Sequence, residues 1–206
     1  AYRTMVWTDL DGKWRTHEIE FPINDYEYYA SIQRYSTLNG VVSPTVYVND
    51  EYNRYLMSKC AEEIKQVCKE NGETDSSKVL SEAIEYVQAI PYTYDDDVYG
   101  WDYPQYPIET LYRQSGDCED TAFLLAGILR ELGYDTCLFE LPGHMAVGVS
   151  TKSVSGMGDA ISFMNGESYY YLESTGYGWN IGSIPQDYLD DDGKLCVTIT
   201  AHLLGN

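Results

Sequence analysis

The chain has 206 residues, enough for one domain with a sizeable core, and carries 13 Lys and Arg against 33 Asp and Glu. The net charge of −20 repels nucleic-acid phosphates and anionic membrane surfaces, which argues against either as a partner. No apolar run is long enough to insert in a membrane, and the five cysteines lack the spacing of a structural zinc site.

The first part of the chain alternates polar and apolar residues on both sides of the turn sequence 9–12. We predict a β-hairpin over 2–21, a short helix over 26–34 capped by Asn24 or Asp25, and then a loop with Asn39 and Gly40. Residues 1–57 are expected to be an accessory region beside the main domain over 58–206, both within one compact unit.

Two amphipathic helices follow, since apolar residues recur at three- and four-residue steps over 50–71 and again over 75–90. Pro91 ends the second helix. Cys60 and Cys68 belong to the apolar stripe of the first helix and are predicted to be buried packing residues. A separation of eight residues is about 12 Å along a helix axis, too far for a disulfide.

Aromatic and acidic residues over 92–106 predict a structured surface loop that can form the wall of a cleft. A buried helix then starts near Cys118 and ends before Gly133. Strand patterns follow, and helices succeeded by antiparallel strands predict an α+β fold. The predicted strands cover 135–141, 144–150, 169–173 and 195–204.

The segment Asp117-Cys-Glu-Asp120 begins the buried helix. Asp117 and Asp120 are predicted to cap it reciprocally, which leaves Cys118 in the first turn, where unpaired amides and the helix dipole favour a thiolate. The flanking acids oppose that form of the sulfur unless their charge is directed at backbone amides.

A reactive thiol needs a base and a group that orients the base. His144 begins an apolar strand, and Glu173 ends a strand that can pair with it, so the two side chains are expected to meet. Taken alone, His144 is equally a turn histidine satisfied by the backbone, and Glu173 a surface acid at a strand end.

The order and context of these three residues resemble the transglutaminase-like superfamily of microbial type, which shares the papain-like core. The resemblance is carried by GDCEDTAFLLAGILRELGYD at 116–135, GHMAVGV at 143–149 and YYYLESTG at 169–176, with YPIETLYRQ at 106–114 similar to the lead-in of microbial members. Many relatives have His-Ala-Trp where this chain has His144-Met-Ala, and Asp in place of Glu173.

The resemblance implies a buried helix with the cysteine at its N-terminus, packed on an antiparallel β-sheet that carries the histidine and the acid. It makes Cys118 the nucleophile, His144 the general base and acid, and Glu173 the carboxylate that orients the ring. The oxyanion would be bound by the Cys118 amide and a side chain from the set Trp101, Tyr103 and Gln114.

The expected function is thiol-dependent acyl transfer, a cysteine peptidase or amidase that acts on peptide or isopeptide bonds through an acyl-enzyme. Two alternatives stay open, namely transglutaminase-type amide cross-linking and a non-catalytic peptide-binding domain of the same fold. The expected partner is a peptide or protein substrate, with a monomer as the default state.

No cofactor or metal is expected, apart from one alternative in which calcium stabilises the protein through residues 95–97 or 117–120. The acidic stretch at 187–193 fails the EF-hand register, since Tyr188 falls where the first carboxylate belongs. The chain opens at Ala1 and enters a strand pattern almost at once. We therefore expect an extracytoplasmic or cell-surface fragment without its targeting segment.

Overall fold

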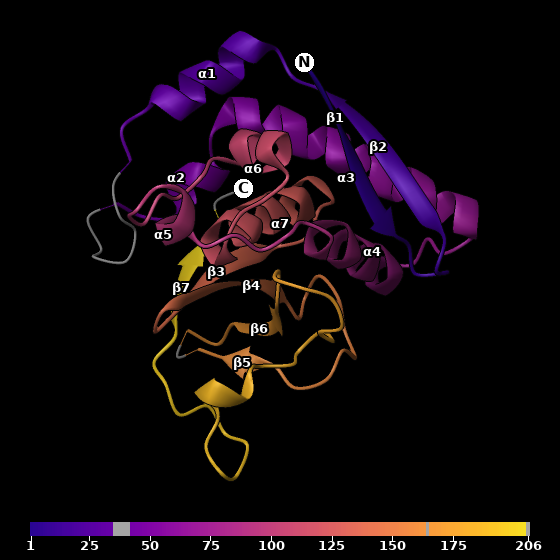
Figure 1. Cartoon of the computed structure of the whole chain (residues 1–206). Helices are drawn as coiled ribbons and strands as arrows, with labels where there is room; N and C mark the ends of the chain where they lie inside the picture. Colours follow the sequence, from indigo (N-terminus) through magenta and orange to yellow (C-terminus); the bar gives the residue numbers. More distant parts are fainter. Residues whose placement is uncertain (35–41, 164, 205–206) are drawn as a thin grey trace.

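The computed structural model describes residues 1–34, 42–163 and 165–204. The fold is mixed α+β, with a curled antiparallel sheet of order β5-β6-β4-β3-β7 and the larger helices layered on one side of it (Figure 1). The α+β class is therefore confirmed. The predicted loop at Asn39 and Gly40 lies outside the described residues.

The N-terminal hairpin is present as predicted, with β1 (Tyr2–Thr8) and β2 (Trp14–Glu20) paired antiparallel as a separate two-stranded sheet. Its tip is held by the buried Asp9 carboxylate, which pairs with Arg15 Nε at 2.7 Å. Trp7 is fully buried, and its indole N–H donates to Glu82 Oε1 at 2.6 Å. The hairpin is thus attached to the helical layer.

The short helix α1 (Ile23–Ser31) begins and ends three residues before the predicted bounds, with Pro22 as the residue before its first turn. Arg34 leaves the helix because its guanidinium makes a buried ion pair with Glu109 and donates to the Pro104 carbonyl at 2.9 Å. The tertiary contacts of Arg34 therefore stabilise the chain more than a further turn of α1 would.

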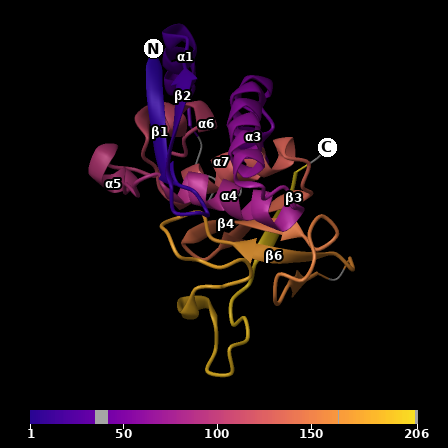
Figure 2. The same cartoon turned by 90° about the vertical axis from the view of Figure 1, so that its right-hand side faces the viewer.

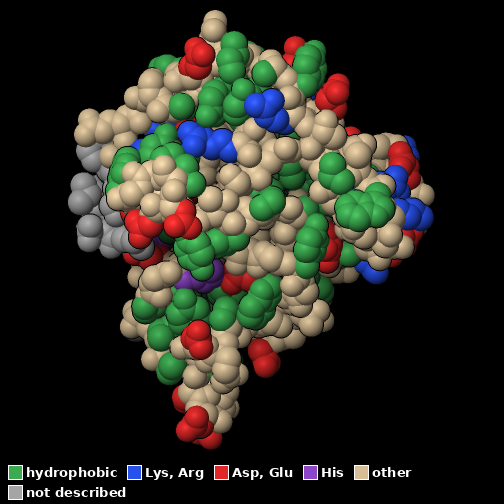
Figure 3. Space-filling view, viewed as in Figure 1, with side chains coloured by type: hydrophobic (Ala, Val, Ile, Leu, Met, Phe, Trp, Pro, Cys, Tyr) green, Lys and Arg blue, Asp and Glu red, His purple; other side chains and the backbone are tan. Residues whose placement is uncertain are grey.

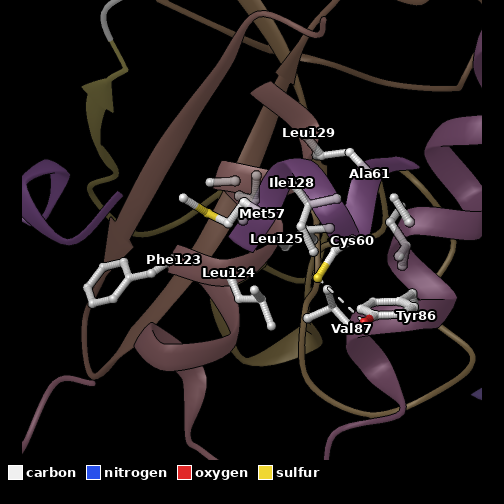
Figure 4. Close-up of a cluster of buried hydrophobic side chains, with 14 of the residues drawn as sticks. Met57, Cys60, Ala61, Tyr86, Val87, Phe123, Leu124, Leu125, Ile128 and Leu129 are labelled. Carbon is white, nitrogen blue, oxygen red and sulfur yellow. Dashed lines mark hydrogen bonds between the residues drawn. The ribbon is translucent and has the colours of Figure 1, made fainter. Parts of the chain in front are cut away.

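Three long helices form the core: α3 (Glu51–Asn71), α4 (Ser76–Gln88) and α7 (Cys118–Glu131). Side chains from all three interleave in the cluster of Figure 4. Cys60 and Cys68 are buried and free of disulfides, which confirms their packing role. The shorter helices are α2 (Thr45–Val48), α5 (Asp95–Val98) and α6 (Pro107–Arg113).

The boundary between the two predicted regions, after Met57, falls inside α3, and the hydrophobic core draws buried residues from both of them. Figure 2 shows the hairpin, α3 and α4 beside one another above the sheet. In the described ranges, no helix has both the length and the apolar composition that crossing a bilayer requires.

The sheet consists of β3 (Thr136–Leu141), β4 (His144–Ser150), β5 (Ile161–Ser162), β6 (Ser168–Leu172) and β7 (Thr200–Leu203). Both of its faces are buried. One packs on the helices, and the other forms a second core that the C-terminal segment covers. Phe139, Ala146 and Tyr171 are buried members of this second core, and the partly buried Ile184, Tyr188 and Val197 of the C-terminal segment pack against it.

The last strand is shorter than the predicted 195–204. Leu195 instead bridges Leu189 across a tight turn, in which the Asp190 carboxylate accepts from the backbone N–H of Lys194 at 2.8 Å. The 3₁₀ turn η1 (Gln186–Tyr188) precedes this turn. The local hydrogen bond of Asp190 therefore stabilises a turn where the alternating sequence predicts a strand.

Gly148 of β4 tests the packing of the second core. A Cβ at this position would lie 2.5 Å from Cys137 Sγ and 2.7 Å from Phe139 Cζ, both in the neighbouring strand. We expect Gly148→Ala to lower the free energy of unfolding by about 1–3 kcal/mol, because the buried ring has little room to move. Urea denaturation measures it. The double variant Phe139→Leu/Gly148→Ala should recover part of the loss, and an unchanged single variant would contradict the packing.

Candidate active site

Cys118 is the first residue of α7, and all residues from 118 to 129 of this helix are buried. The predicted return cap is present, since the Asp117 backbone N–H donates to Asp120 Oδ2 at 3.3 Å. Asp120 also accepts from the Gln105 backbone N–H at 2.6 Å. The helix start is thereby fixed to the chain that precedes it.

His144 and Glu173 meet because β4 and β6 pair antiparallel, with Val147 opposite Leu172. Nε2 of His144 lies 2.9 Å from Oε2 of Glu173, the contact expected from the sequence. The carboxylate is held by several further donors, so it can fix the orientation of the ring. These donors are Tyr171 Oη at 2.9 Å, Ser174 N at 3.0 Å, Thr175 N at 3.1 Å and Thr175 Oγ1 at 2.8 Å.

The protonation of this pair follows from the carboxylate. Burial alone would raise the pKa of Glu173, but the hydrogen bond and charge of His144 and the bonds from Thr175 outweigh burial and lower the pKa. Glu173 is then ionised at neutral pH, so the imidazole Nε2 must carry the hydrogen that it donates. In the part of the chain that the structure describes, no hydrogen bond involves His144 Nδ1.

Cys118 and His144 line one pocket of 240 Å³. Tyr92 and Tyr94, both partly exposed, form an aromatic wall of the pocket. On the face shown in Figure 3, histidine atoms lie close to acidic side chains, and Lys and Arg lie in the upper and right-hand parts. The remaining lining residues are Asp102, Asp117, Glu119, Gly143 and Met145.

The sulfur of Cys118 makes a hydrogen bond with a neighbouring acid. Its thiol donates to Glu119 Oε2 at 3.0 Å, and no hydrogen bond joins it to His144 within the described residues. Burial raises the pKa of the thiol far above its usual range, and the charges of Glu119 and Asp117 raise it further. The Met145 N–H acts in the opposite direction and is the smaller effect. The dipole of α7 is thus outweighed, and the sulfur is protonated in this conformation.

None of the three candidates for binding an oxyanion lines this pocket. Gln114 lies in left-handed backbone, φ 54°, and its amide donates to the Thr4 carbonyl at 2.6 Å. The Tyr103 hydroxyl donates to Glu109 Oε1 at 2.8 Å. Trp101 is 46% exposed and packs edge-on against Tyr103. Of the groups expected to bind an oxyanion, the Cys118 backbone amide is the one that lies beside the sulfur.

Four acids lie near the start of α7. Asp117 and Glu119 lie beside the Cys118 sulfur, and Asp95 and Asp102 lie close to Glu119. Burial, aided by the charges of neighbouring acids, raises the pKa of Asp95 to about 6 and that of Asp117 to about 10. Both effects disfavour the charged form of these acids when no positive partner is near. These groups could hold a cation.

Sequence reasoning missed several residues at the site. Tyr171 had a usable signal, because residues two apart on a strand share a face and it precedes Glu173 by two. Tyr188, whose ring stacks on His144 at 6.1 Å between centroids, had none. Glu119 was noted in the sequence as an acid next to Cys118, but its hydrogen bond with the sulfur was not predicted.

No family model and no curated protein matches this chain. Its function must therefore be inferred from its own residues.

Replacement of Glu173 by Gln should show a distinctive pH dependence. A carboxyl whose pKa is lowered by folding stabilises the protein above its unfolded pKa, about 4.3, and this contribution is lost as the pH falls through the folded value. We expect Glu173→Gln to cost about 1–3 kcal/mol at pH 7, with the difference from wild type shrinking toward pH 3. Urea denaturation at both pH values measures it.

Glu140→Gln is the matched control, since Glu140 also pairs with a histidine, His202, at 2.7 Å, but both side chains are more exposed. Its cost at pH 7 should stay below about 1 kcal/mol. Equal costs for the two variants would mean that the burial and the extra donors of Glu173 add nothing.

Replacement of Glu119 by Gln should increase the reactivity of Cys118. It removes a negative charge and an acceptor that favour the protonated sulfur. Each unit by which the thiol pKa falls multiplies the thiolate fraction by about ten below that pKa. Iodoacetamide labelling at pH 8 in EDTA, quantified by peptide mass mapping, measures the rate. The exposed Cys196 is an internal reference, and an unchanged ratio of Cys118 to Cys196 labelling would contradict the effect.

Proposed function

We propose that the chain is a thiol-dependent acyl-transfer enzyme with a papain-like or transglutaminase-like core, acting as a cysteine peptidase or amidase on peptide or isopeptide bonds. One observation carries the proposal. The Glu173 carboxylate orients His144 through Nε2 and leaves Nδ1 without a hydrogen bond among the described residues, in a pocket that Cys118 also lines.

In the proposed reaction, His144 Nδ1 takes the proton of the Cys118 thiol as the sulfur attacks the carbonyl carbon of the substrate. The oxyanion accepts a hydrogen bond from the Cys118 amide, which α7 leaves without an intrahelical partner. His144 then returns the proton to the leaving amine, and a thioester remains on Cys118.

Water completes the reaction. It attacks the thioester carbon and gives a proton to His144, and the sulfur regains that proton as the carboxylic acid leaves. An amine that attacks the same thioester gives cross-linking instead. The carboxylates that line the pocket favour such a cationic acceptor, which keeps transamidation as the second enzymatic candidate.

The reaction has to begin with a movement of the thiol. In the structure the sulfur donates to Glu119, so the Cys118 side chain must rotate about its Cα–Cβ bond before it can give its proton to His144. The same bond is the observation that favours a non-catalytic peptide-binding domain, in which Tyr92 and Tyr94 would contact the peptide and the sulfur would stay protonated.

Alkylation distinguishes these functions. We expect iodoacetamide at pH 6 to label Cys118 of the Glu119→Gln variant roughly tenfold or more faster than the exposed Cys196, because loss of the Glu119 acceptor lets the sulfur pair with His144, and an imidazolium partner favours the thiolate. Adding His144→Ala should abolish this advantage and leave the Cys196 rate unchanged. Peptide mass mapping at short times gives both rates in one sample.

His17→Ala is the matched control, because His17 bonds to Tyr86 and does not line the pocket. If Cys118 of Glu119→Gln reacts more slowly than Cys196 and the addition of His144→Ala changes nothing, the enzymatic proposal fails. The peptide-binding domain is then the better description.

A further inference from the structure

The four carboxylates beside the pocket come from two stretches of the chain, α5 with the loop that follows it and the start of α7. Asp95 begins α5, Asp102 lies in the loop after it, and Asp117 and Glu119 flank Cys118 at the start of α7. One oxygen each from Asp95, Asp102 and Glu119 lies within 4.8 Å of the others. An oxygen of Asp117 lies within the same limit of Glu119. We call these four residues the acidic cluster.

The cluster lacks a positive partner for its buried members. Within the described parts of the chain, no Lys, Arg or His side chain forms an ion pair with Asp95, Asp117 or Glu119. Neither Lys nor Arg lines the pocket. Buried carboxylates are costly unless they are paired or bind a metal ion.

Asp117 gives an independent indication of a ligand. Its side chain is 8% exposed, and its Oδ1 is buried without a hydrogen-bond partner among the described residues. Carboxylate oxygens have several acceptor sites and are almost always satisfied when buried. The orphaned oxygen belongs to a carboxyl group that lies within 4.8 Å of Glu119, on a residue that lines the same 240 Å³ cavity, which indicates a cation as the missing partner.

We propose that the acidic cluster binds one calcium ion. Two oxygens that share a calcium ion at its usual 2.3–2.6 Å lie at most about 5 Å apart. The oxygens of Asp95, Asp102 and Glu119 satisfy this limit without rearrangement, and Asp117 satisfies it with Glu119. Calcium accepts irregular sets of carboxylates, whereas magnesium requires a near-octahedral set at shorter distances. Zinc prefers sulfur and nitrogen ligands and would also bind the Cys118 sulfur. Because most of the ligands here are carboxylate oxygens, calcium fits the set better than zinc.

The pocket supplies a path for the ion, because Asp102, Asp117 and Glu119 all line it. This site goes beyond the proposed acyl transfer and does not require it, since the ligands are carboxylates whether or not Cys118 is a nucleophile. An ion on Glu119 competes with the Cys118 thiol for the same carboxylate, so the two sites are neighbours that share one residue.

The test is calcium titration of the full chain after treatment with EDTA, by isothermal calorimetry and by thermal unfolding. We expect one saturable site with a Kd at or below about 1 mM, the weak end of protein calcium sites, and a rise in Tm with added calcium. Asp102→Asn/Glu119→Gln should weaken binding at least tenfold and remove the rise in Tm.

The matched control is Asp191→Asn/Asp192→Asn, which removes the same number of charges from exposed residues and should bind calcium like the wild type. Circular dichroism in EDTA shows whether each variant is folded, and Asp117→Asn provides a second, single-site loss of affinity. Absence of saturable calcium binding overturns the proposal. So does equal binding by the wild type and the cluster variant, or binding of zinc alone that Cys118→Ser abolishes.

Discussion

The complete burial of the first three turns of α7 is the constraint on which the rest of the molecule depends. A helix buried on all sides needs a partner in every direction, and here α3, α4 and the sheet supply them. The closest approach is at Gly127, where a Cβ would lie 1.7 Å from Met57 Sδ. Because α7 cannot shift without opening this core, the position of Cys118 at its first residue is set by packing.

The segment that orients His144 is attached to the same helix. Thr121 Oγ1 and Ser174 Oγ are 2.9 Å apart, and Gln88 of α4 donates to the Glu173 carbonyl at 2.8 Å. Glu173 therefore takes its place from the two helices as well as from β6. The cysteine, the histidine and the acid are held by one continuous core, which is the arrangement that the proposed proton transfer requires.

Many of the helices and strands were predictable from the sequence, because they depend on the spacing of apolar residues. The hairpin, α3, α4, α7 and the pairing of β4 with β6 all follow from regular apolar spacing, and that pairing brings Glu173 to His144. The bond from Cys118 to Glu119 was not predictable from the sequence. Adjacent residues of a helix point in different directions, and whether their side chains meet depends on the packing around them. The aperiodic loop over 92–106 hid the place of Trp101 and Tyr103, and with it the approach of Asp95 and Asp102 to Glu119.

The hydrogen bond from Cys118 to Glu119 also bears on the chemical lifetime of the protein. Peroxides attack thiolates rather than thiols, so a sulfur whose proton is retained by a carboxylate oxidises slowly. The five cysteines are free of disulfides, and four of them are buried. In the proposed enzyme, a resting state in which Glu119 keeps Cys118 protonated protects the sulfur from oxidation to sulfenic acid until a substrate binds.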